Sequence, residues 1–496
     1  MSSQFFSIRY KTKAFKSFSY LFITLLAGCA VGPDYKKPDV SLPTEFKQAS
    51  GWKQATPSDD APRGSWWEVY HDPILNDLEL SVAKQNQSLQ ALAYNYEQSR
   101  QIARSDFTTF LPFGGFSASS NHTKSPITKS SQGNISSSST GLLTASWSPD
   151  FWGKIRRLTE SDTAASQVSA ANYANAKLSI EATLAQDYIQ LRILDEKKRL
   201  IDKAVEAYNK TLLISQNKYT VGVAARRDVI SSQAQRDAAR AQSIDVGVQR
   251  TQIEHAIAVL IGKSPEELSI EVKPSLDLSL PTIPYAVPAS LLERRPDVAA
   301  AERYMAEQNA KIGIQTAAYF PSITLTGSTG YQGTPISNLI SSPFKLWSLG
   351  VNATDTILDY GERHDLVLAT SAGYNASVAS YRQTVLSAIQ QVDDQLSNLS
   401  ILELESSIQG EAVKEAAEAA RIAQNEYAAG TVDYTTVVLA EVTELNDRES
   451  SLAILQNRLN ASIKLIEGLG GGWNNTQLPT TSQTLFHTLE DNQSKR

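Results

Sequence analysis

The feature that most constrains the fold of this chain is a short motif that occurs twice. Tyr219 and Gly222 frame one Tyr-x-x-Gly motif, and Tyr427 and Gly430 frame the second. The two glycines lie 208 positions apart (430 − 222). A long helical pattern rich in Ala and Gln stands on either side of each motif, and a glycine at such a place ends a helix. The sequence therefore predicts two long helical hairpins, each with a turn at its tip.

Other landmarks recur at nearly the same spacing. Pro112 and Pro321, which each follow a helical pattern, are 209 positions apart (321 − 112). Gly153 and Gly361, which each precede one, are 208 positions apart (361 − 153). Repetition at one offset across several landmarks indicates a duplicated unit. Each half is predicted to run as helix, strand pair, long helix, turn and helix, so the fold class is mainly α with a β part.

The segments between the first and second helix of each half alternate with period two. Leu143, Ala145 and Trp147 alternate with small polar residues, which is the strand signal. About ten residues suffice for a tilted strand to cross a bilayer. Lipid-facing strands must close into a barrel, because open edges leave backbone groups unpaired in hydrocarbon, and the smallest such barrels have about eight strands. Four strands per chain therefore predict that several chains share one barrel, and three chains would supply twelve strands; an ordinary soluble sheet is the alternative.

The first long helix is expected from about residue 158 to 219. About 60 residues at 1.5 Å each give a rod of about 90 Å, too long for a compact core. Small residues in its apolar stripe allow close packing, while Gln, Asn and Ser can face water. Such helices could form the wall of a water-filled tube. The mean hydropathy of −0.27 argues against a bundle of membrane helices.

The N-terminus reads as a secretory leader. A basic region precedes the short apolar run 18–27, which ends in Leu26-Ala27-Gly28-Cys29. This sequence resembles a bacterial lipobox, which implies cleavage before Cys29 and acylation of that residue. Because Cys29 is the only cysteine, no intramolecular disulfide can form; a buried structural cysteine is the alternative. Lipid would anchor the chain. In bacterial lipoproteins an Asp directly after the cysteine resembles an inner-membrane retention signal, so Ala30 at this position favours the outer membrane.

The landmarks divide the chain into six consecutive parts. These are a signal peptide (1–28), an N-terminal linker (29–73), a first repeat (74–262), a Pro-rich connector (263–290), a second repeat (291–469) and a flexible C-terminal tail (470–496). Strand pairs are expected at about 113–150 and 322–358, and hairpin tips at about 219–228 and 427–436. The helix that opens the first repeat is expected to run unbroken from Ile74 to about Phe107.

No pattern in the sequence points to catalysis. The histidines show no zinc-binding spacing, and there is no Gly-x-Ser-x-Gly elbow and no phosphate-binding loop. We expect no enzyme activity, no metal and no cofactor apart from the lipid on Cys29. The net charge of −6 argues against a nucleic-acid partner. The five histidines are His71, His122, His255, His364 and His487.

Several motifs together resemble the outer-membrane factor (TolC-type) family, in its lipoprotein branch, over nearly all of the mature chain. They are Leu26–Cys29, Val31–Tyr35, Trp66-Trp67, Asp72-Pro73, Leu292–Glu302, Phe320–Ser322, Asp359–Gly361 and the two Tyr-x-x-Gly motifs. The resemblance implies a homotrimer, with a twelve-stranded barrel in the outer membrane continuous with a periplasmic α-helical barrel. A mixed equatorial region that includes the connector would surround the helices.

The resemblance also implies a function. Members are the exit ducts of tripartite efflux pumps, which close at the hairpin tips, open when a periplasmic adaptor protein docks and draw energy from a proton-driven inner-membrane pump. We expect passive exit of drugs or other small molecules, as in multidrug resistance. A duct for protein (type I) secretion and a pore-free lipidated coiled-coil protein are the alternatives.

One position departs from the family pattern. Relatives often carry an acid shortly after the second tip glycine, where it forms a constricting ring, but Thr436 and Leu439 stand at the expected places here. Asp433 is close enough to supply a negative ring that gates the aperture or selects ions. The alternative is a solvated carboxylate at a helix start, where the helix dipole favours it.

Overall fold

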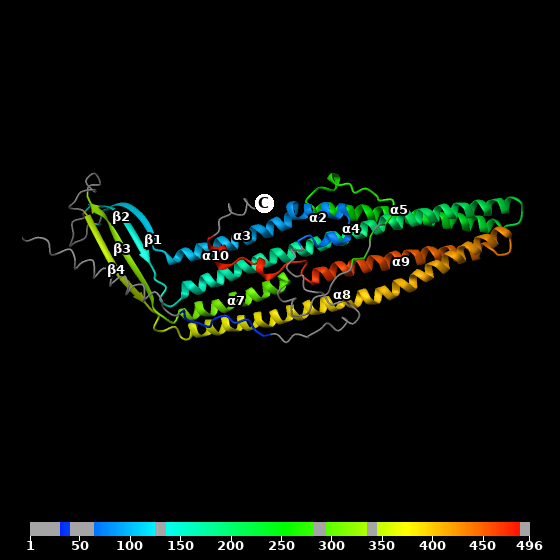
Figure 1. Ribbon diagram of the computed structural model, residues 1–496. Coiled ribbons are helices and arrows are strands. Elements are labelled where there is room, and N and C mark those ends of the chain that lie inside the picture. Colours follow the sequence, from blue (N-terminus) through cyan, green and yellow to red (C-terminus); the bar gives the residue numbers. More distant parts are fainter. Residues whose placement is uncertain are drawn as a thin grey trace, which may run out of the picture.

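The computed structural model describes residues 30–39, 64–124, 126, 135–276, 278, 280–281, 294–334 and 345–486. Cys29 and the leader lie outside these residues, as do residues 282–290 of the connector, 291–293 at the start of the second repeat and 487–496 of the tail. The described chain is elongated, with a sheet at one end, two helix–helix turns at the other end and packed helices between them (Figure 1).

Both halves contain the predicted order of elements. The first half holds α2 (Pro73–Gln85), α3 (Gln87–Phe107), β1 (Phe113–Lys124), β2 (Ile135–Trp147), α4 (Lys154–Thr220) and α5 (Arg226–Leu260). The second holds α7 (Pro296–Ala317), β3 (Ser322–Gly333), β4 (Lys345–Thr354), α8 (Glu362–Ala429) and α9 (Tyr434–Gly468). Shorter helices are η1 (Trp66–Tyr70), η2 (Thr108–Phe110), η3 (Pro265–Glu267), η6 (Asn475–Gln477) and α10 (Thr481–Phe486).

The four strands form one antiparallel sheet in the order β1-β2-β3-β4. The two repeats join at β2 and β3, whose pairing runs from Ser139 opposite Gly333 to Trp147 opposite Leu325. β1 and β4 are the outer strands of this sheet. Large apolar side chains such as Phe116 and Trp347 are exposed on it. In the described part of the chain, both edges of the sheet are therefore without a neighbouring strand.

The helix expected from Ile74 to Phe107 is interrupted. Asn86 adopts an extended conformation between α2 and α3. Its side chain accepts a hydrogen bond from the Leu89 amide (2.9 Å) and donates one to the Leu260 carbonyl (2.7 Å). Asn86 thus caps the start of α3 and also satisfies a carbonyl at the end of α5, a long-range contact that local periodicity does not report.

The C-terminal segment also departs from the expectation of a flexible tail. It contains η6 and α10, and α10 packs beside α3 (Figure 1). The rings of Phe486 and Phe107 meet edge to face with centroids 5.3 Å apart, and Thr484 and Leu485 are buried. Burial of these side chains compensates for the entropy of ordering the segment.

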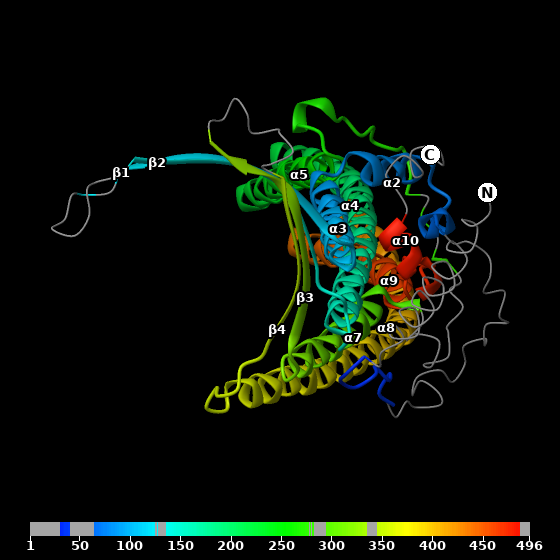
Figure 2. The ribbon, with the colours of Figure 1, turned by 90° about the vertical axis from the view of Figure 1, so that its left-hand side faces the viewer.

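The four helices nearest the sheet form a row in the order α3, α4, α7, α8 (Figure 1). Seen along the long axis, they and the sheet follow an open curve (Figure 2). The main core lies at mid-length, where Trp66 and Trp67 of η1 pack with residues such as Tyr188 of α4, Ile257 of α5 and Ile463 of α9. In the described part of the chain, no helix has both the length and the apolarity needed to cross a membrane.

Candidate functional site: the paired hairpin tips

Both predicted tip turns end a long helix with a glycine in the left-handed conformation. Gly222 has φ 80° and Gly430 has φ 85°. At the first tip the Val223 amide donates to the Lys218 carbonyl (2.9 Å), and at the second the Thr431 amide donates to the Glu426 carbonyl (3.0 Å). These are six-to-one bonds of a helix C-terminus, which a left-handed residue makes possible. The space around both glycines is open, so backbone conformation alone explains them.

The two motif tyrosines lie in different environments. Tyr427 is 4% exposed, whereas Tyr219 is 47% exposed. The Tyr427 hydroxyl lies 3.0 Å from the Ser215 hydroxyl of α4. The Lys218 ammonium lies 4.2 Å from the Tyr427 ring centroid and also donates to the Tyr427 carbonyl. The second tip is therefore fastened to the first hairpin by Tyr427.

The difference follows from the residues at equivalent positions. At the offset of 208, Ser215 corresponds to Ala423 (423 − 215) and Lys218 to Glu426 (426 − 218). Alanine offers no hydroxyl partner, and a glutamate offers no cation for a tyrosine ring. The repeat predicted where the two tyrosines occur, but it did not predict that only one of them would be buried.

A buried carboxylate joins four helices just above the tips. Glu441 of α9 is buried and accepts hydrogen bonds from Thr211 of α4 (3.0 Å), Gln424 of α8 (2.8 Å) and Gln235 of α5 (3.3 Å). Burial raises the pKa of Glu441, and these three hydrogen bonds oppose that rise. In the sequence Glu441 is one of the acids nearest the second tip, but no role was predicted for it. A signal was present, since Tyr434, Val437 and Glu441 share one helix face at steps of three and four.

Asp433 is the N-cap residue of α9. It is exposed, and its carboxylate accepts hydrogen bonds from the Thr436 amide (3.1 Å) and the Thr436 hydroxyl (3.0 Å). These are the contacts expected of a carboxylate at a helix start. Asp228, in the first turn of α5, lies 3.6 Å from the Arg227 guanidinium. The geometry accounts for Asp433 as a cap without reference to a gate.

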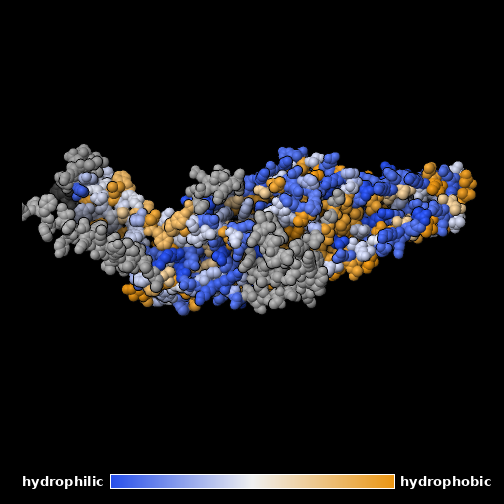
Figure 3. Space-filling model, viewed as in Figure 1, coloured by the Kyte–Doolittle hydropathy of each residue, from blue (hydrophilic) through white to orange (hydrophobic). Residues whose placement is uncertain are grey.

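The first tip also carries exposed apolar side chains. Tyr219, Val221 and Val223 are 47%, 72% and 73% exposed. Apolar residues are visible at this end of the space-filling view, while polar residues dominate much of the middle of the same face (Figure 3). An exposed apolar cluster on a polar rod is a common sign of a protein contact.

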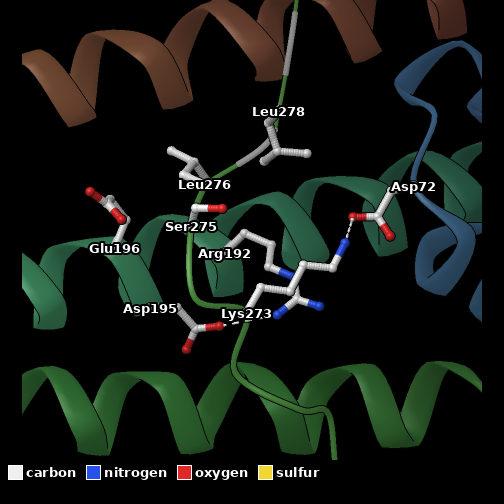
Figure 4. Close-up of a pocket in the computed structure, with 8 residues that line it drawn as sticks. All are labelled: Asp72, Arg192, Asp195, Glu196, Lys273, Ser275, Leu276 and Leu278. Carbon is white, nitrogen blue, oxygen red and sulfur yellow. Dashed lines mark hydrogen bonds and ion pairs between the residues drawn. The ribbon is translucent and has the colours of Figure 1, made fainter.

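A charged cluster at mid-length holds the connector in place. Lys273 of the connector pairs with Asp72 (2.7 Å), and Arg192 of α4 pairs with Asp195 (3.3 Å) (Figure 4). Arg192 also donates to the Glu271 carbonyl (2.8 Å). The cavity between them, about 10 Å³, has room for about one water molecule. The cluster therefore holds the connector against α4 and is too small to bind a substrate.

Comparison with known proteins matches this architecture. A family model described as outer membrane efflux protein matches residues 81–263 and 287–471. The toluene efflux pump outer membrane protein TtgF of Pseudomonas putida is 25% identical over 477 residues, which cover 94% of this chain and 99% of TtgF. Nodulation protein T of Rhizobium leguminosarum bv. trifolii is 27% identical over 451 residues, which cover 89% of this chain and 92% of the relative.

Solved structures agree. The outer-membrane channel OprN superposes with a TM-score of 0.84 at 26% identity, covering 90% of this chain and 100% of OprN. The open state of the Neisseria gonorrhoeae MtrE outer membrane channel superposes with a TM-score of 0.79 at 26% identity, covering 90% of this chain and 98% of MtrE. With both repeats matched, the chain belongs to the outer membrane efflux protein family and is an outer membrane transport channel with a periplasmic helical portion, not an enzyme.

Proposed function

We propose that this protein is the exit duct of a tripartite efflux pump and gives drugs or other small molecules passive passage from the periplasm to the exterior. The observation that carries this proposal is the pairing of a four-stranded sheet, which exposes apolar side chains such as Phe116 and Trp347, with long helices whose tips are held together by Tyr427 and Glu441. A duct needs both a pore through the membrane and an end that can close. Energy would enter from a proton-driven pump in the inner membrane.

The proposed assembly is a homotrimer. β1 and β4 are the two outer strands of the sheet, and a sheet edge exposed to hydrocarbon leaves backbone groups unpaired. Three copies would close a barrel of twelve strands, above the minimum of about eight. Native mass spectrometry in detergent tests this assembly, and a monomer that retains the fold and the activity would contradict it.

We also propose a lipid anchor on Cys29, as in the lipoprotein branch of the family. Cys29 lies outside the described residues, but Ala30 is held next to the start of α4. The Val31 amide donates to the Trp152 carbonyl (3.1 Å), and a Cβ on Gly153 would lie 2.6 Å from the Ala30 Cα. Acyl chains on Cys29 would therefore begin beside the junction of sheet and helices. Intact-mass measurement of the mature chain, with Cys29→Ala as control, tests the modification.

The proposed docking point of the periplasmic adaptor is the first tip, with its exposed Tyr219, Val221 and Val223. Val221→Asp places a charge on this apolar cluster and should weaken adaptor binding and resistance without loss of the oligomer. Val248→Asp, on an exposed position in the body of α5, is the matched control. Equal loss in both variants would count against the tip as the docking point.

The substrate class is proposed from the relatives, some of which are described as toluene or antibiotic efflux components. Deletion of the gene should raise sensitivity to solvents or antibiotics, and the wild-type gene should restore resistance. Unchanged sensitivity together with loss of a secreted protein would favour the protein-export alternative. Purified protein that gives no discrete conductance steps in bilayers would favour the pore-free alternative.

A further inference from the structure

The internal repeat indicates how one copy of the chain meets the next. Within each repeat the short helix packs on the long one, α3 on α4 and α7 on α8, and α4 also packs on α7 of the other repeat. By the repeat, α8 corresponds to α4 and α3 corresponds to α7. Helices α3 and α8 stand at opposite ends of the row in Figure 1. Among the described elements, α8 therefore has no counterpart of the α4–α7 contact.

Two aromatic rings stack beside that contact, one just before α4 and one just after α7. Trp152 stacks on Phe320, with ring centroids 4.7 Å apart and an interplanar angle of 19°, and its indole nitrogen donates to the Pro321 carbonyl (2.8 Å). The equivalent residues are Tyr360 (360 − 152 = 208), Leu111 (320 − 111 = 209) and Pro112 (321 − 112 = 209). Tyr360 is 92% exposed and Leu111 is 64% exposed. The ring of Tyr360 and its apolar seat, Leu111 and Pro112, therefore lie at opposite ends of the row.

A charged side chain also lies at a fixed place between the two helices of that contact. Arg157 of α4 packs over Gly313 of α7, where an added Cβ would lie 2.7 Å from the arginine Cγ. The equivalent residues are Asp365 of α8 (365 − 157 = 208) and Arg104 of α3 (313 − 104 = 209). The arginine has changed helices, and an acid now stands where Arg157 stands in the first repeat. In the described part of the chain, neither Arg104 nor Asp365 forms an ion pair.

The strands extend the same correspondence. β1 with β2 pairs Phe113 opposite Ser146, and β3 with β4 pairs Ser322 opposite Thr354, so the repeats differ by 209 in the first strand and 208 in the second (322 − 113 and 354 − 146). Applied to Leu142 opposite Gly330, these shifts place residue 350 of β4 opposite residue 121 of β1 in a second copy. The offsets of 208 and 209 that relate the helices of the two repeats therefore also relate their strands.

We propose that Arg104 forms an ion pair with Asp365 of the partner subunit, beside the ring of Tyr360 of the partner subunit, which packs on Leu111 and Pro112. This inference rests on the proposed assembly into a ring, and it specifies which surfaces meet and in what register. The charges are complementary, and the aromatic ring faces an apolar seat. The contact repeats the one that α4 and α7 make within the chain.

A charge swap tests the ion pair. Arg104→Glu and Asp365→Arg should each lower, by several degrees, the temperature at which the detergent-solubilised oligomer dissociates, and the double variant should recover most of the loss. Glu411→Lys, on an exposed position of the same helix α8, is the control and should have no effect. Losses that add in the double variant, or that Glu411→Lys matches, would overturn the pairing.

Cross-linking tests the register independently. With a short bis-thiol reagent, Leu111→Cys combined with Tyr360→Cys should give covalent dimers and trimers, while each single variant should not. Trp152→Cys with Phe320→Cys should cross-link only within one chain. An intact oligomer without cross-links would overturn this contact and leave the proposed assembly standing. Absence of any oligomer in the unmodified protein would overturn the assembly itself.

Discussion

Thr211 donates a hydrogen bond to Glu441 at 3.0 Å, across 230 positions of sequence. The contact joins α4 to α9, and through Gln424 and Gln235 the same carboxylate also reaches α8 and α5. It is the one place among the described contacts near the tips where a single side chain bonds to all three other helices of the two hairpins.

Glu441→Ala should loosen the tips. The substitution removes the shared acceptor of the buried Thr211 hydroxyl and of the half-buried Gln424 and Gln235 amides. An unsatisfied buried group costs about 1–3 kcal/mol. We expect larger or more frequent conductance openings in bilayers and greater uptake of a large antibiotic by cells. Glu441→Gln, which keeps one acceptor oxygen, should have a smaller effect. Glu444→Ala, three residues further along α9, is the control; equal leakage from it would show that Glu441 has no special role.

Asp433 requires variants that separate charge from capping. Asp433→Asn keeps an N-cap acceptor and removes the charge, whereas Asp433→Ala removes both and should cost the helix about 1 kcal/mol. Because the carboxylate bonds to Thr436, we expect only the alanine variant to lower thermal stability. Single-channel recording tests the proposed negative ring: reduced cation selectivity in Asp433→Asn would support it, and unchanged conductance and selectivity in both variants would rule it out.

Glu181 predicts a pH dependence of stability. Burial raises the pKa of Glu181 to about 7 from 4.5, and burial with the charge of Glu181 also raises the pKa of Glu79. The folded protein holds the Glu181 proton more tightly than the unfolded chain does. The protonated Glu181 therefore contributes to the free energy of unfolding in full below about pH 4.5, and this contribution is lost as the pH rises through about 7. The unfolding temperature should therefore fall over this range.

Glu181→Gln should flatten that profile and raise the unfolding temperature at pH 8, since the amide cannot ionise. Calorimetry of the detergent-solubilised protein at several pH values measures both effects. Glu160→Gln, a partly exposed acid of the same helix, should leave the profile unchanged. A wild-type profile that is flat between pH 5 and 8 would contradict the assignment.

Gly32→Ala should release the N-terminal strap, residues 30–35. Gly32 has φ 91°, and a Cβ there would lie 2.5 Å from the Gly313 Cα, a backbone atom that cannot move aside. The strap also depends on Arg157, which pairs with Asp34 (2.8 Å). We expect faster proteolysis near residue 32, measured by mass spectrometry of the fragments. Gly64→Ala, around which the space is open, should not change the cleavage rate.

Much of the fold could be predicted because the sequence contains the same structural unit twice. The glycines at 222 and 430 and the alternating strand segments are local signals, and the shared offset shows that they belong to one repeated plan. The burial of Tyr427 could not be predicted in this way. It depends on Ser215 and Lys218 of a different hairpin, and no local pattern reports which side chains meet across two packed hairpins.

Other features were hidden for the same physical reason. Asn86 breaks the first helix because its side chain reaches the Leu260 carbonyl, 174 positions away. The order of α10 depends on Phe107, in a helix far from the C-terminus in sequence. The role of Glu441 was visible only as an acid on an apolar helix face, a signal that indicates burial without naming the partners.

The unequal tips have a mechanical consequence for the proposed ring. Within one chain the Tyr427 contacts fasten the two hairpins together, whereas the equivalent seam between chains would bring Tyr219 against Ala423 and Glu426, which lack the hydroxyl and the cation. The aperture would then consist of three stiff leaves, each the two fastened hairpins of one chain, that meet at three weaker seams between chains. It would not consist of six independent hairpins. Any force that widens it would part the seams first and leave each leaf intact.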